Sequence, residues 1–533
     1  MQETIEARLN VAEAISLAFG LFIDGHYAEA EPLFRTAEQH GGGFPALNGL
    51  GMCLNELERP QEALLCFDHA YALLRDEMFA LIANRGKALA EAGKSDEAIA
   101  VFDGLLKNSS NEQVRNYRAI VQTNKGDIDE SSREFEALST NNPANDQFKY
   151  NRALVHLQQG KAQECIDACD DLLTRDQPNP HLVHFARGFA HLMLGNYEKG
   201  FADYEHRRLD NVDPPWTEFK GNLCEAPTWN GEDISDKTIL VHADQGLGDN
   251  IMFSRYLPLM VKKAKRVIVA LPKGQQIITN SVPGTEYVSG AESIVAEKFS
   301  GGPKVIIEKS EYDTGQYKEG RGAWPMVDCW IRFMSLAFAF KTTRENIPPP
   351  ITLKVDDANL KRWQERIGNG GNLKVGLCWA GAFKSRYDKH RTIALEKLEP
   401  LFDLPNITFY SLQKELRDGD AELIEKHGII DLGPELKTFE ETACAMKCLD
   451  LMVTVDTSVA HLAGTVGLPT LVMLTKFRTY WLWLSGENMS PWYPSIEVFQ
   501  QQTDGNWDNV VAGVVQKISL NLQRSLHDVD WSD

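Results

Sequence analysis

The sequence predicts an α-helical solenoid followed by an α/β region made of two halves that face each other. Three observations support this fold class: a motif that recurs every 33 to 35 residues before residue 210, an alternation of short apolar runs with helical periodicity after residue 236, and a proline run, Pro348–Pro350, that divides the alternation. Of the 533 residues, 43% are hydrophobic and 24% are charged, as in globular rather than disordered chains.

The repeated motif is a turn followed by a small residue and, four positions later, a large one. Turn signals such as Gly25-His26-Tyr27 and Gly126-Asp127-Ile128 precede it six times. Residues four apart lie on one face of a helix, so the small one lets a neighbouring helix approach and the large one fills the adjoining space. The pairs are Ala30/Phe34, Ala63/Phe67, Ala98/Phe102, Ser131/Phe135, Cys165/Cys169 and Gly200/Tyr204.

This period and pattern resemble tetratricopeptide repeats. The resemblance implies about six stacked helix pairs in a solenoid domain over residues 1–210. The concave face of such a solenoid often binds peptide or protein, and we expect a protein or glycan partner there. The alternative is that the solenoid only stiffens or dimerises the chain, and the sequence is compatible with a homo-oligomer.

The first α/β half is expected over residues 237–347, after a connector at 211–236 that has prolines, glycines and two tryptophans but no helical period. A helical pattern over 251–263 follows a glycine-containing loop. Strand, glycine loop, helix and strand are the start of a parallel doubly wound sheet. The expected strands are 237–243, 266–271 and 304–307.

The second half is expected over residues 348–533, with helices over 439–449 and 458–467 between its strands. A last helix over 505–526 is expected to cross back to the first half. Ligands in such sheets bind outside the carboxyl ends of the strands, in the cleft between the halves. The expected strands are 374–379, 407–412, 451–455, 470–474 and 496–499.

The loop DQGLGDN (244–250) opens a helix at the carboxyl end of the first strand. Gly246 and Gly248 allow another group to approach the backbone closely. Asp249 has two interpretations: a helix cap worth ~1 kcal/mol, or a carboxylate aimed into the cleft as a general base. A dinucleotide fingerprint is disfavoured because the third glycine is missing and an acid at the helix mouth would oppose a pyrophosphate.

The segment DTSVAHLAG (456–464) directly follows the strand over 451–455. Thr457 and Ser458 lie where a helix N-terminus has unsatisfied N–H groups, an arrangement suited to a diphosphate. His461 follows one turn later and belongs either to the same site or to the core or surface. Asp456 faces the site or caps the helix.

Two further strand ends of the second half carry amide or basic groups. After the strand over 374–379, a glycine loop leads to Lys384 and to a basic cluster containing Arg391, which either holds phosphate oxygens or is a solvated charge run. After the strand over 407–412, Gln413 is suited to reading a base or phosphate and Lys414 to neutralising it. These groups, with one carboxylate from the first half, suit transfer from a nucleotide-activated donor.

Composition excludes several classes of function. The net charge of −20 disfavours general nucleic-acid binding, and the absence of an apolar run of ~18–20 residues predicts no membrane insertion. Nine dispersed cysteines without a C-x-x-C pair, and an N-terminal stretch with early acids, predict reduced thiols, no secretory signal and a cytoplasmic location. The D-x-D at 418–420 lies in a polar stretch beyond a strand end, so we expect no metal and no cofactor.

Four of these segments resemble glycosyltransferase family 9, the heptosyltransferase-like group, and in particular bacterial proteins in which tetratricopeptide repeats precede such a domain. They are GLGD with Pro258 nine residues after Asp249, the WAG loop with its basic cluster, SLQK, and DTSVAHLAG. The resemblance implies a GT-B fold of two facing Rossmann-like domains, with the acceptor side at 237–347 and the donor side at 348–533. It also implies inverting, metal-independent transfer from a nucleotide-diphosphate sugar.

The resemblance also implies roles for individual residues, with Asp249 as the catalytic base and Gly246 and Gly248 in its loop. SLQK additionally resembles the donor-binding strand end of O-GlcNAc transferases. The residues implied for the donor and its phosphates are Lys384, Arg391, Gln413, Lys414, Asp456, Thr457, Ser458 and His461.

The sequence therefore predicts a hexosyl- or heptosyl-type glycosyltransferase that moves a sugar from a nucleotide-diphosphate donor to a protein or glycan acceptor. The alternative is a non-catalytic repeat scaffold with a nucleotide-binding GT-B module. An NAD-dependent enzyme is disfavoured, because neither a third glycine nor an acid about 20 residues beyond the loop is present at the expected place.

Overall fold

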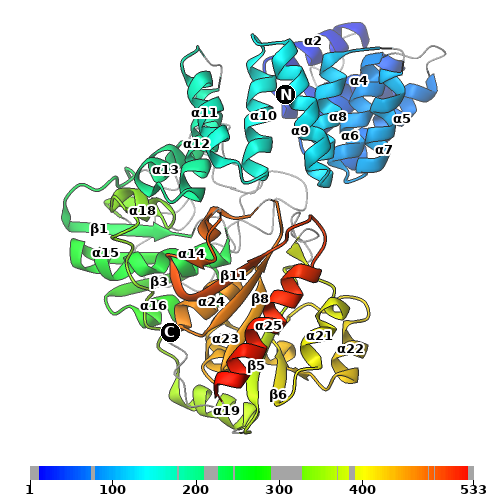
Figure 1. The fold of residues 1–533 in the computed structure, drawn as a ribbon. Coiled ribbons are helices and arrows are strands. Elements are labelled where there is room, and N and C mark those ends of the chain that lie inside the picture. Colours follow the sequence, from blue (N-terminus) through cyan, green and yellow to red (C-terminus); the bar gives the residue numbers. More distant parts are fainter. Residues whose placement is uncertain are drawn as a thin grey trace. The chain divides into compact units, whose positions relative to one another are not determined.

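The computed structural model describes residues 11–73, 79–107, 109–176, 179–208, 226–243, 246–289, 327–368, 370–382, 391–477, 479–484 and 486–525. The chain divides into two compact units, Met1–His156 and Leu157–Asp533, and the division falls within helix α10 (Asp146–Gln158) (Figure 1). Each unit is described by itself.

The first unit consists of antiparallel helix pairs. The predicted turns lie between the helices of each pair, and their central residues have left-handed backbone: Gly25 at φ 82°, Glu58 at 59°, Gly93 at 81° and Gly126 at 113°. The helices before α10 are α2 (Val11–Ile23), α3 (Tyr27–Gln39), α4 (Gly43–Glu56), α5 (Pro60–Leu73), α6 (Phe79–Glu91), α7 (Ser95–Leu106), α8 (Glu112–Lys125) and α9 (Ile128–Asn141).

The recurring small and large residues are buried between these helices, as predicted. Ala30 and Phe34 are both fully inaccessible. The ring of Phe34 lies over Gly49 of the next helix, where an added Cβ would come within 2.3 Å of the ring. Glycine is therefore required at that contact, and Gly86 lies under Phe102 in the same way.

The repeat pattern continues into the second unit, which begins with α11 (Ala162–Leu173), α12 (Pro180–Met193), α13 (Tyr197–Tyr204) and η1 (Glu205–Arg208). These helices pack against the α/β region. Tyr197 lies edge-on to Trp492, with 5.6 Å between ring centroids, and the buried Arg207 donates from Nη2 to Ser335 Oγ at 2.9 Å. The last helix pair and the α/β region therefore share one core.

The first sheet consists of four parallel strands in the order β3-β2-β1-β4. Two predicted strands are confirmed, and the one predicted over 304–307 lies outside the described residues. The helix predicted over 251–263 is divided into α14 (Leu247–Phe253), η2 (Ser254–Tyr256) and α15 (Leu257–Lys263), with Pro258 in the first turn of α15. The strands are β1 (Ile234–His242), β2 (Ala264–Leu271), β3 (Thr285–Ser289) and β4 (Cys329–Arg332), with α16 (Ile277–Ser281) and α18 (Ser335–Ala339) beside them.

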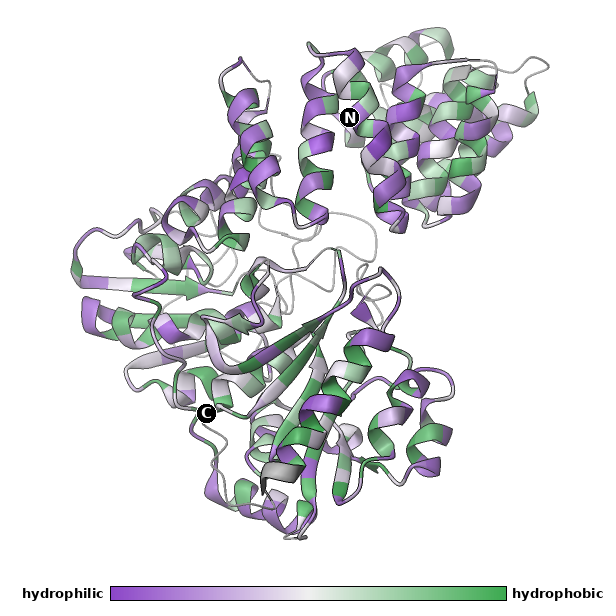
Figure 2. Ribbon diagram, in the orientation of Figure 1, coloured by the Kyte–Doolittle hydropathy of each residue, from purple (hydrophilic) through white to green (hydrophobic). Residues whose placement is uncertain are grey.

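The second sheet has the order β10-β11-β9-β8-β5-β6-β7 and is parallel except for the β10–β11 pair. Every residue of β8 and β9 is buried, and Figure 2 shows hydrophobic residues along the strands of this sheet. All five predicted strands are confirmed. The strands are β5 (Leu373–Cys378), β6 (Ile407–Ser411), β7 (Ile430–Asp431), β8 (Leu451–Val455), β9 (Thr470–Leu474), β10 (Met489–Ser490) and β11 (Tyr493–Gln500).

The six parallel strands of this sheet follow the doubly wound order 3-2-1-4-5-6, in which β5 is strand 1 and β8 is strand 4. Helices cover the sheet on both faces, as in Rossmann-like folds. The helices of this half are α19 (Asp357–Ile367), η4 (Leu395–Leu398), α21 (Glu399–Phe402), α22 (Asp420–Lys426), η5 (Gly433–Glu435), α23 (Phe439–Met446), α24 (Ser458–Val466), η6 (Trp481–Trp483) and α25 (Asp508–Ser525).

The terminal helix was expected to cross back to the first half, and this expectation is wrong. Val510, Val514 and Ile518 of α25 are buried in the core cluster of the second half, together with strand residues of β5 and β8. The apolar face of α25 therefore packs against the sheet of its own half. Among the described residues, no helix is both long and apolar enough to span a bilayer.

Candidate functional site

The candidate site lies at the carboxyl ends of β5 and β8, the two neighbouring strands where the order of the second sheet reverses. Crevices at such switch points bind ligands in doubly wound sheets. After β5 the chain is described to residue 382 and again from Arg391, and the segment after β8 is the start of α24. The structure brings these two stretches together: Arg391 Nη1 donates to the backbone oxygen of Asp456 at 2.9 Å.

The N-terminus of α24 is built as the sequence predicts. Thr457 is the N-cap, and its hydroxyl accepts from the N–H of Val459 at 3.2 Å. Ser458 is the first helical residue and is half-buried. Burial raises the pKa of Asp456 above its usual range, and the nearby Arg391 guanidinium opposes this shift. The N-terminus of α24, called the α24 mouth below, therefore combines backbone N–H groups, the Arg391 guanidinium and the Asp456 carboxyl, which is easier to protonate than usual.

Gln413 and Lys414, at the end of β6, differ in their surroundings. Gln413 is buried, and its Oε1 accepts from the backbone N–H groups of Trp379 at 3.1 Å and Ala380 at 3.0 Å. Its side chain thus holds the loop after β5 in place. Lys414 is exposed. Lys384 lies outside the described residues.

Asp420, the second carboxylate of the D-x-D stretch at 418–420, makes structural contacts. Asp420 is buried, and its Oδ2 accepts from the Trp379 indole N–H at 2.9 Å and from the Arg417 backbone N–H at 2.7 Å. The Arg417 guanidinium in turn donates to the backbone oxygen of Gly381 at 2.6 Å. These contacts attach the loop after β5 to the start of α22.

Asp249 lies in the first turn of α14, half-buried. Its Oδ2 accepts from the N–H of Gly246 at 2.9 Å, which is the helix-capping contact, and its Oδ1 accepts from the hydroxyl of Tyr480 at 2.9 Å. Burial and the negative charge of Asp249 raise the pKa of Tyr480 well above its usual value, so this hydroxyl stays a donor. Asp249 therefore caps α14, and its carboxylate also makes a hydrogen bond to the second half.

Gly248 is the point at which α14 meets α24. An added Cβ there would come within 2.4 Å of the His461 ring, so only glycine fits. His461 is buried, and its Nδ1 lies 3.2 Å from the hydroxyl of Tyr493. Burial, aided by the Arg255 guanidinium, lowers the pKa of His461 to about 3, so the ring is neutral at pH 7.

Three residues of this region were missed by sequence reasoning. Arg255 is buried, with its guanidinium carbon 5.0 Å from the ring centroids of both Trp492 and Tyr493. Tyr480 and Tyr493 come from segments after β9 that carry no glycine loop or charge pattern. Only the dense aromatic content of 477–493 could have drawn attention to them.

The arrangement brings two helix N-termini of opposite character together. The α24 mouth, with Arg391, is suited to an anion such as a diphosphate. The α14 mouth carries the Asp249 carboxylate, which is suited to accepting a proton or a hydroxyl hydrogen bond. Such a pair can hold a phosphate-bearing donor on one side and orient a hydroxyl on the other.

Comparisons with known proteins give evidence for the repeats. A tetratricopeptide repeat family model matches residues 118–180. Protein FlbA of Caulobacter vibrioides is 26% identical over 495 residues, which cover 88% of this chain and 77% of that protein. Together with the helix pairs and their buried motif, the family match identifies the N-terminal helices as tetratricopeptide repeats.

Solved structures of two tetratricopeptide repeat proteins are similar to part of this chain. A tetratricopeptide repeat protein from Parabacteroides merdae is 21% identical, with a TM-score of 0.34, over 37% of this chain and 77% of its own. YrrB, described as a TPR protein with an unusual peptide-binding site, is 18% identical, with a TM-score of 0.25, over 32% of this chain and 88% of its own.

Proposed function

We propose that the chain is a glycosyltransferase that moves a sugar from a nucleotide-diphosphate donor to a hydroxyl of a protein or glycan acceptor. The observation that carries the proposal is the contact between Gly248 and His461, which holds the α14 mouth with Asp249 beside the α24 mouth with Thr457. A carboxylate beside an anion-binding helix end is what transfer from a diphosphate-activated donor needs.

In the proposed reaction the donor diphosphate binds at the N–H groups of α24, with Arg391 offsetting its charge. Asp249 accepts the proton of the acceptor hydroxyl as its oxygen attacks the anomeric carbon. The bond from that carbon to the diphosphate oxygen breaks, and the diphosphate leaves with the electron pair. Attack from the face opposite the leaving group inverts the configuration, and no metal takes part at this site.

The surroundings of Asp456 and His461 fit supporting roles on the donor side. Asp456 lies beside Arg391 at the N-terminus of α24, and burial raises the pKa of its carboxyl above the usual range. The neutral, buried His461 adds no positive charge and fixes the distance between the two helix mouths. Lys384, Gln413, Lys414 and Ser458 stay predicted members of the donor side.

One observation favours a second candidate, a repeat scaffold whose α/β part binds a nucleotide without catalysis. Both carboxylate oxygens of Asp249 already accept hydrogen bonds, from Gly246 and Tyr480. A carboxylate used to attach α14 to the second half needs no role in proton transfer. In the first candidate the repeats present the protein or glycan acceptor, and in the second they bind a protein partner.

The first experiment is thermal stability of the chain against ADP, UDP, GDP, CMP and their sugar conjugates. Binding at 100 times the dissociation constant adds about 2.7 kcal/mol of stability. We expect a shift with one diphosphate class that is lost in Arg391→Ala and Thr457→Val but kept in the control Lys361→Ala, an exposed position on α19. No shift with any compound contradicts nucleotide binding, and with it both candidates.

The second experiment separates the two candidates by release of the nucleoside diphosphate from the bound donor. Asp249→Asn keeps the capping contact, because its side-chain oxygen still accepts from Gly246. We expect it to keep the nucleotide-dependent stability shift and to lose ~10²–10⁴-fold of turnover. Unchanged turnover in Asp249→Asn overturns the assignment of the base, and nucleotide binding without any turnover in the wild type favours the scaffold. Asp418→Asn, an exposed carboxylate change, is the matched control.

A further inference from the structure

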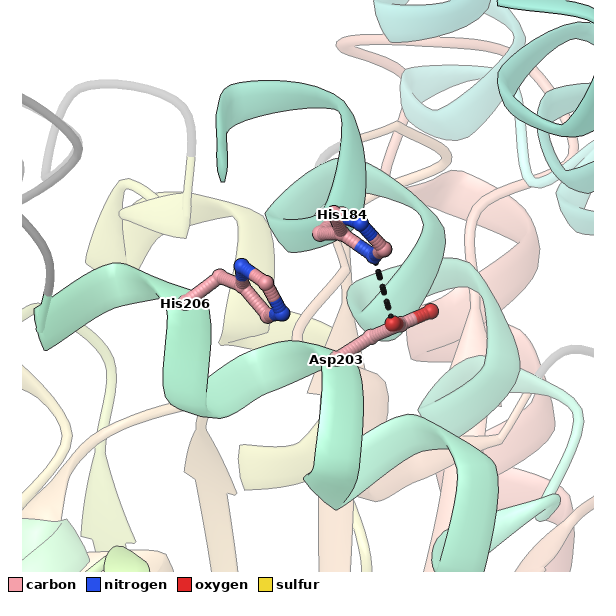
Figure 3. Close-up of side chains that lie close together, drawn as sticks. All are labelled: His184, Asp203 and His206. Carbon is pink, nitrogen blue, oxygen red and sulfur yellow. Dashed lines mark hydrogen bonds and ion pairs between the residues drawn. The ribbon is translucent and has the colours of Figure 1, made fainter. Parts of the chain in front are cut away.

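A cluster of histidines outside the candidate site lies at the end of the last repeat. His181 and His184 are one turn apart on α12, and Asp203 and His206 are one turn apart across α13 and η1. Figure 3 shows His184, Asp203 and His206 converging from these two helical segments. All of them belong to the second unit, and none takes part in the proposed transfer.

The polar atoms of the cluster are close enough to share a single ion. One ligand atom each from His184, Asp203 and His206 lies within 4.8 Å of the other two. His184 Nδ1 and Asp203 Oδ1 are 2.8 Å apart, and the His184 and His206 rings are stacked with centroids 4.0 Å apart. His181 Nδ1 lies 3.1 Å from His206 Nδ1.

These spacings are near those of a zinc-type coordination shell. Bonds of ~2.0–2.2 Å in a tetrahedral site place neighbouring ligand atoms about 3.3 Å apart. The 2.8 Å contact between His184 and Asp203 is shorter than that edge by a few tenths of an ångström, and the 4.8 Å limit is longer. The His184 and His206 rings are stacked at an interplanar angle of 13°, and an imidazole nitrogen binds a metal in the plane of its ring. Both rings therefore have to turn towards a common point when a cation replaces the shared proton.

The charge around the cluster also suits a cation. Arg187 lies beside the cluster and is bound by two carboxylates: its Nε donates to Asp203 Oδ2 at 2.6 Å and its Nη1 donates to Asp170 Oδ1 at 2.6 Å. One positive and two negative charges leave a net charge of −1. Arg187 also fixes the Asp203 carboxylate, but its Nη2 donates to Oδ1 at 3.1 Å and lies 3.3 Å from His184 Nδ1, so this end of the guanidinium has to turn away when a cation binds.

We propose that His184, Asp203 and His206 form a binding site for a divalent transition metal of the zinc type. Two imidazoles and one carboxylate are ligands that such ions prefer. His181 orients His206 through the contact between their ring nitrogens, and Arg187 orients Asp203, as outer-shell partners do in metal sites. The ion joins α12 to the segment that follows α13 and so fastens the end of the repeats.

The test uses the untagged full-length chain, freed of metal by a chelator and dialysed at pH 7.5. Titration with Co²⁺ reports the coordination shell by its visible absorption, and competition with Zn²⁺ gives the affinity. We expect one equivalent of metal per chain, a d–d absorption typical of tetrahedral or five-coordinate Co²⁺, and a rise in melting temperature with Zn²⁺. Absence of saturable binding up to ~100 µM, far weaker than structural zinc sites, overturns the proposal.

Variants locate the ion. His184→Asn and His206→Gln should each weaken binding by more than ~100-fold, and His181→Gln should weaken it by ~10–100-fold, as loss of an outer-shell partner does. The matched control is His191→Asn, on the same helix but outside the cluster. In chelator the variants should retain wild-type circular dichroism, which excludes misfolding as the cause. Equal metal binding by the wild type, His184→Asn and His206→Gln would place the ion elsewhere and overturn the assignment.

Discussion

Two contacts between a glycine and a ring, one in each unit, solve the same packing problem with different chemistry. In the repeats, an added Cβ on Gly49 would come within 2.3 Å of the Phe34 ring. At the candidate site, an added Cβ on Gly248 would come within 2.4 Å of the His461 ring. In both places a missing side chain lets a ring approach the backbone of a neighbouring helix.

Burial affects the two rings differently: it is favourable for the apolar Phe34 ring and costly for the titratable His461 ring. Phe34 lies in an apolar cluster, and burying such a ring stabilises the fold by about 1.5–3 kcal/mol. His461 is buried beside Arg255 and Tyr493, where burial lowers its pKa to about 3. The repeat contact is thus explained by stability alone, whereas the histidine contact carries an electrostatic cost that points to a role in the site.

The largest expected effect in this comparison is on the repeat side. Phe34→Ala removes a fully buried ring and should lower the free energy of unfolding of the first unit by ~3–5 kcal/mol. All eleven tryptophans lie after residue 156, so tryptophan fluorescence reports the second unit while circular dichroism reports both. We expect the circular-dichroism transition to shift and the fluorescence transition to stay. Leu65→Ala, at an exposed position, is the control and should change stability by less than ~0.5 kcal/mol.

The second effect is on the histidine side. Gly248→Ala forces a methyl group against the His461 ring and should destabilise the second unit by ~1–3 kcal/mol, seen in the fluorescence transition. It should also weaken nucleotide-dependent stabilisation, since it separates the two helix mouths. Gly104→Ala, where nothing lies within 4 Å of the added atom, should be neutral or stabilising. If both variants behave alike, the close approach at Gly248 is not a constraint.

The third effect is a pH dependence that only the histidine contact can produce. Because the folded pKa of His461 is about 3, below the unfolded value of ~6.5, the unfolded state binds one more proton between these values. Stability of the second unit is therefore lost as pH falls below ~6.5, by about 1.4 kcal/mol per pH unit from this group. His461→Gln should reduce the slope between pH 6.5 and 5, measured by urea unfolding. An identical slope in the wild type and in His461→Gln would contradict a buried, neutral His461.

The two contacts also differ in how far the sequence predicts them. The repeat core was predictable because Ala30 and Phe34 belong to a motif that recurs, and the left-handed turns at Gly25 and Gly126 confirm its spacing. At the candidate site the sequence located both helix mouths, because each follows a buried strand. The bond from Tyr480 to Asp249 was not predictable, because residues 231 positions apart meet only through the fold.

Two expectations show other physical limits. The terminal helix was assigned to the wrong half because its apolar face fits any uncovered sheet, and only packing decides which. The histidine cluster was overlooked although His181/His184 and Asp203/His206 are each spaced three apart. Each pair alone is an ordinary surface pattern, and it becomes a candidate metal site only when two helices bring the pairs together.

The smallest expected effect tests the hydrogen bond between Tyr480 and Asp249, which joins the two halves. Tyr480→Phe removes the hydroxyl that donates to Asp249 Oδ1 and should cost ~0.5–1.5 kcal/mol in the fluorescence transition. In Asp249→Asn the amide oxygen stays on Gly246 and the NH₂ group faces Tyr480, so the bond that Tyr480 donates is lost. The double variant should therefore be less destabilised than the sum of the two changes, by ~0.5 kcal/mol or more.

Tyr410→Phe, which removes a hydroxyl bonded to the backbone oxygen of Ile367, is the control and should add to Asp249→Asn without coupling. Coupling in stability with unchanged turnover in Asp249→Asn would assign the carboxylate to attaching α14, the role that Phe34 and Gly49 fill in the repeats. Coupling together with lost turnover would show that one carboxylate both attaches the helix and accepts the proton. Strict additivity would mean that the Tyr480 bond contributes nothing to stability, and the comparison between the two contacts would then rest on His461 alone.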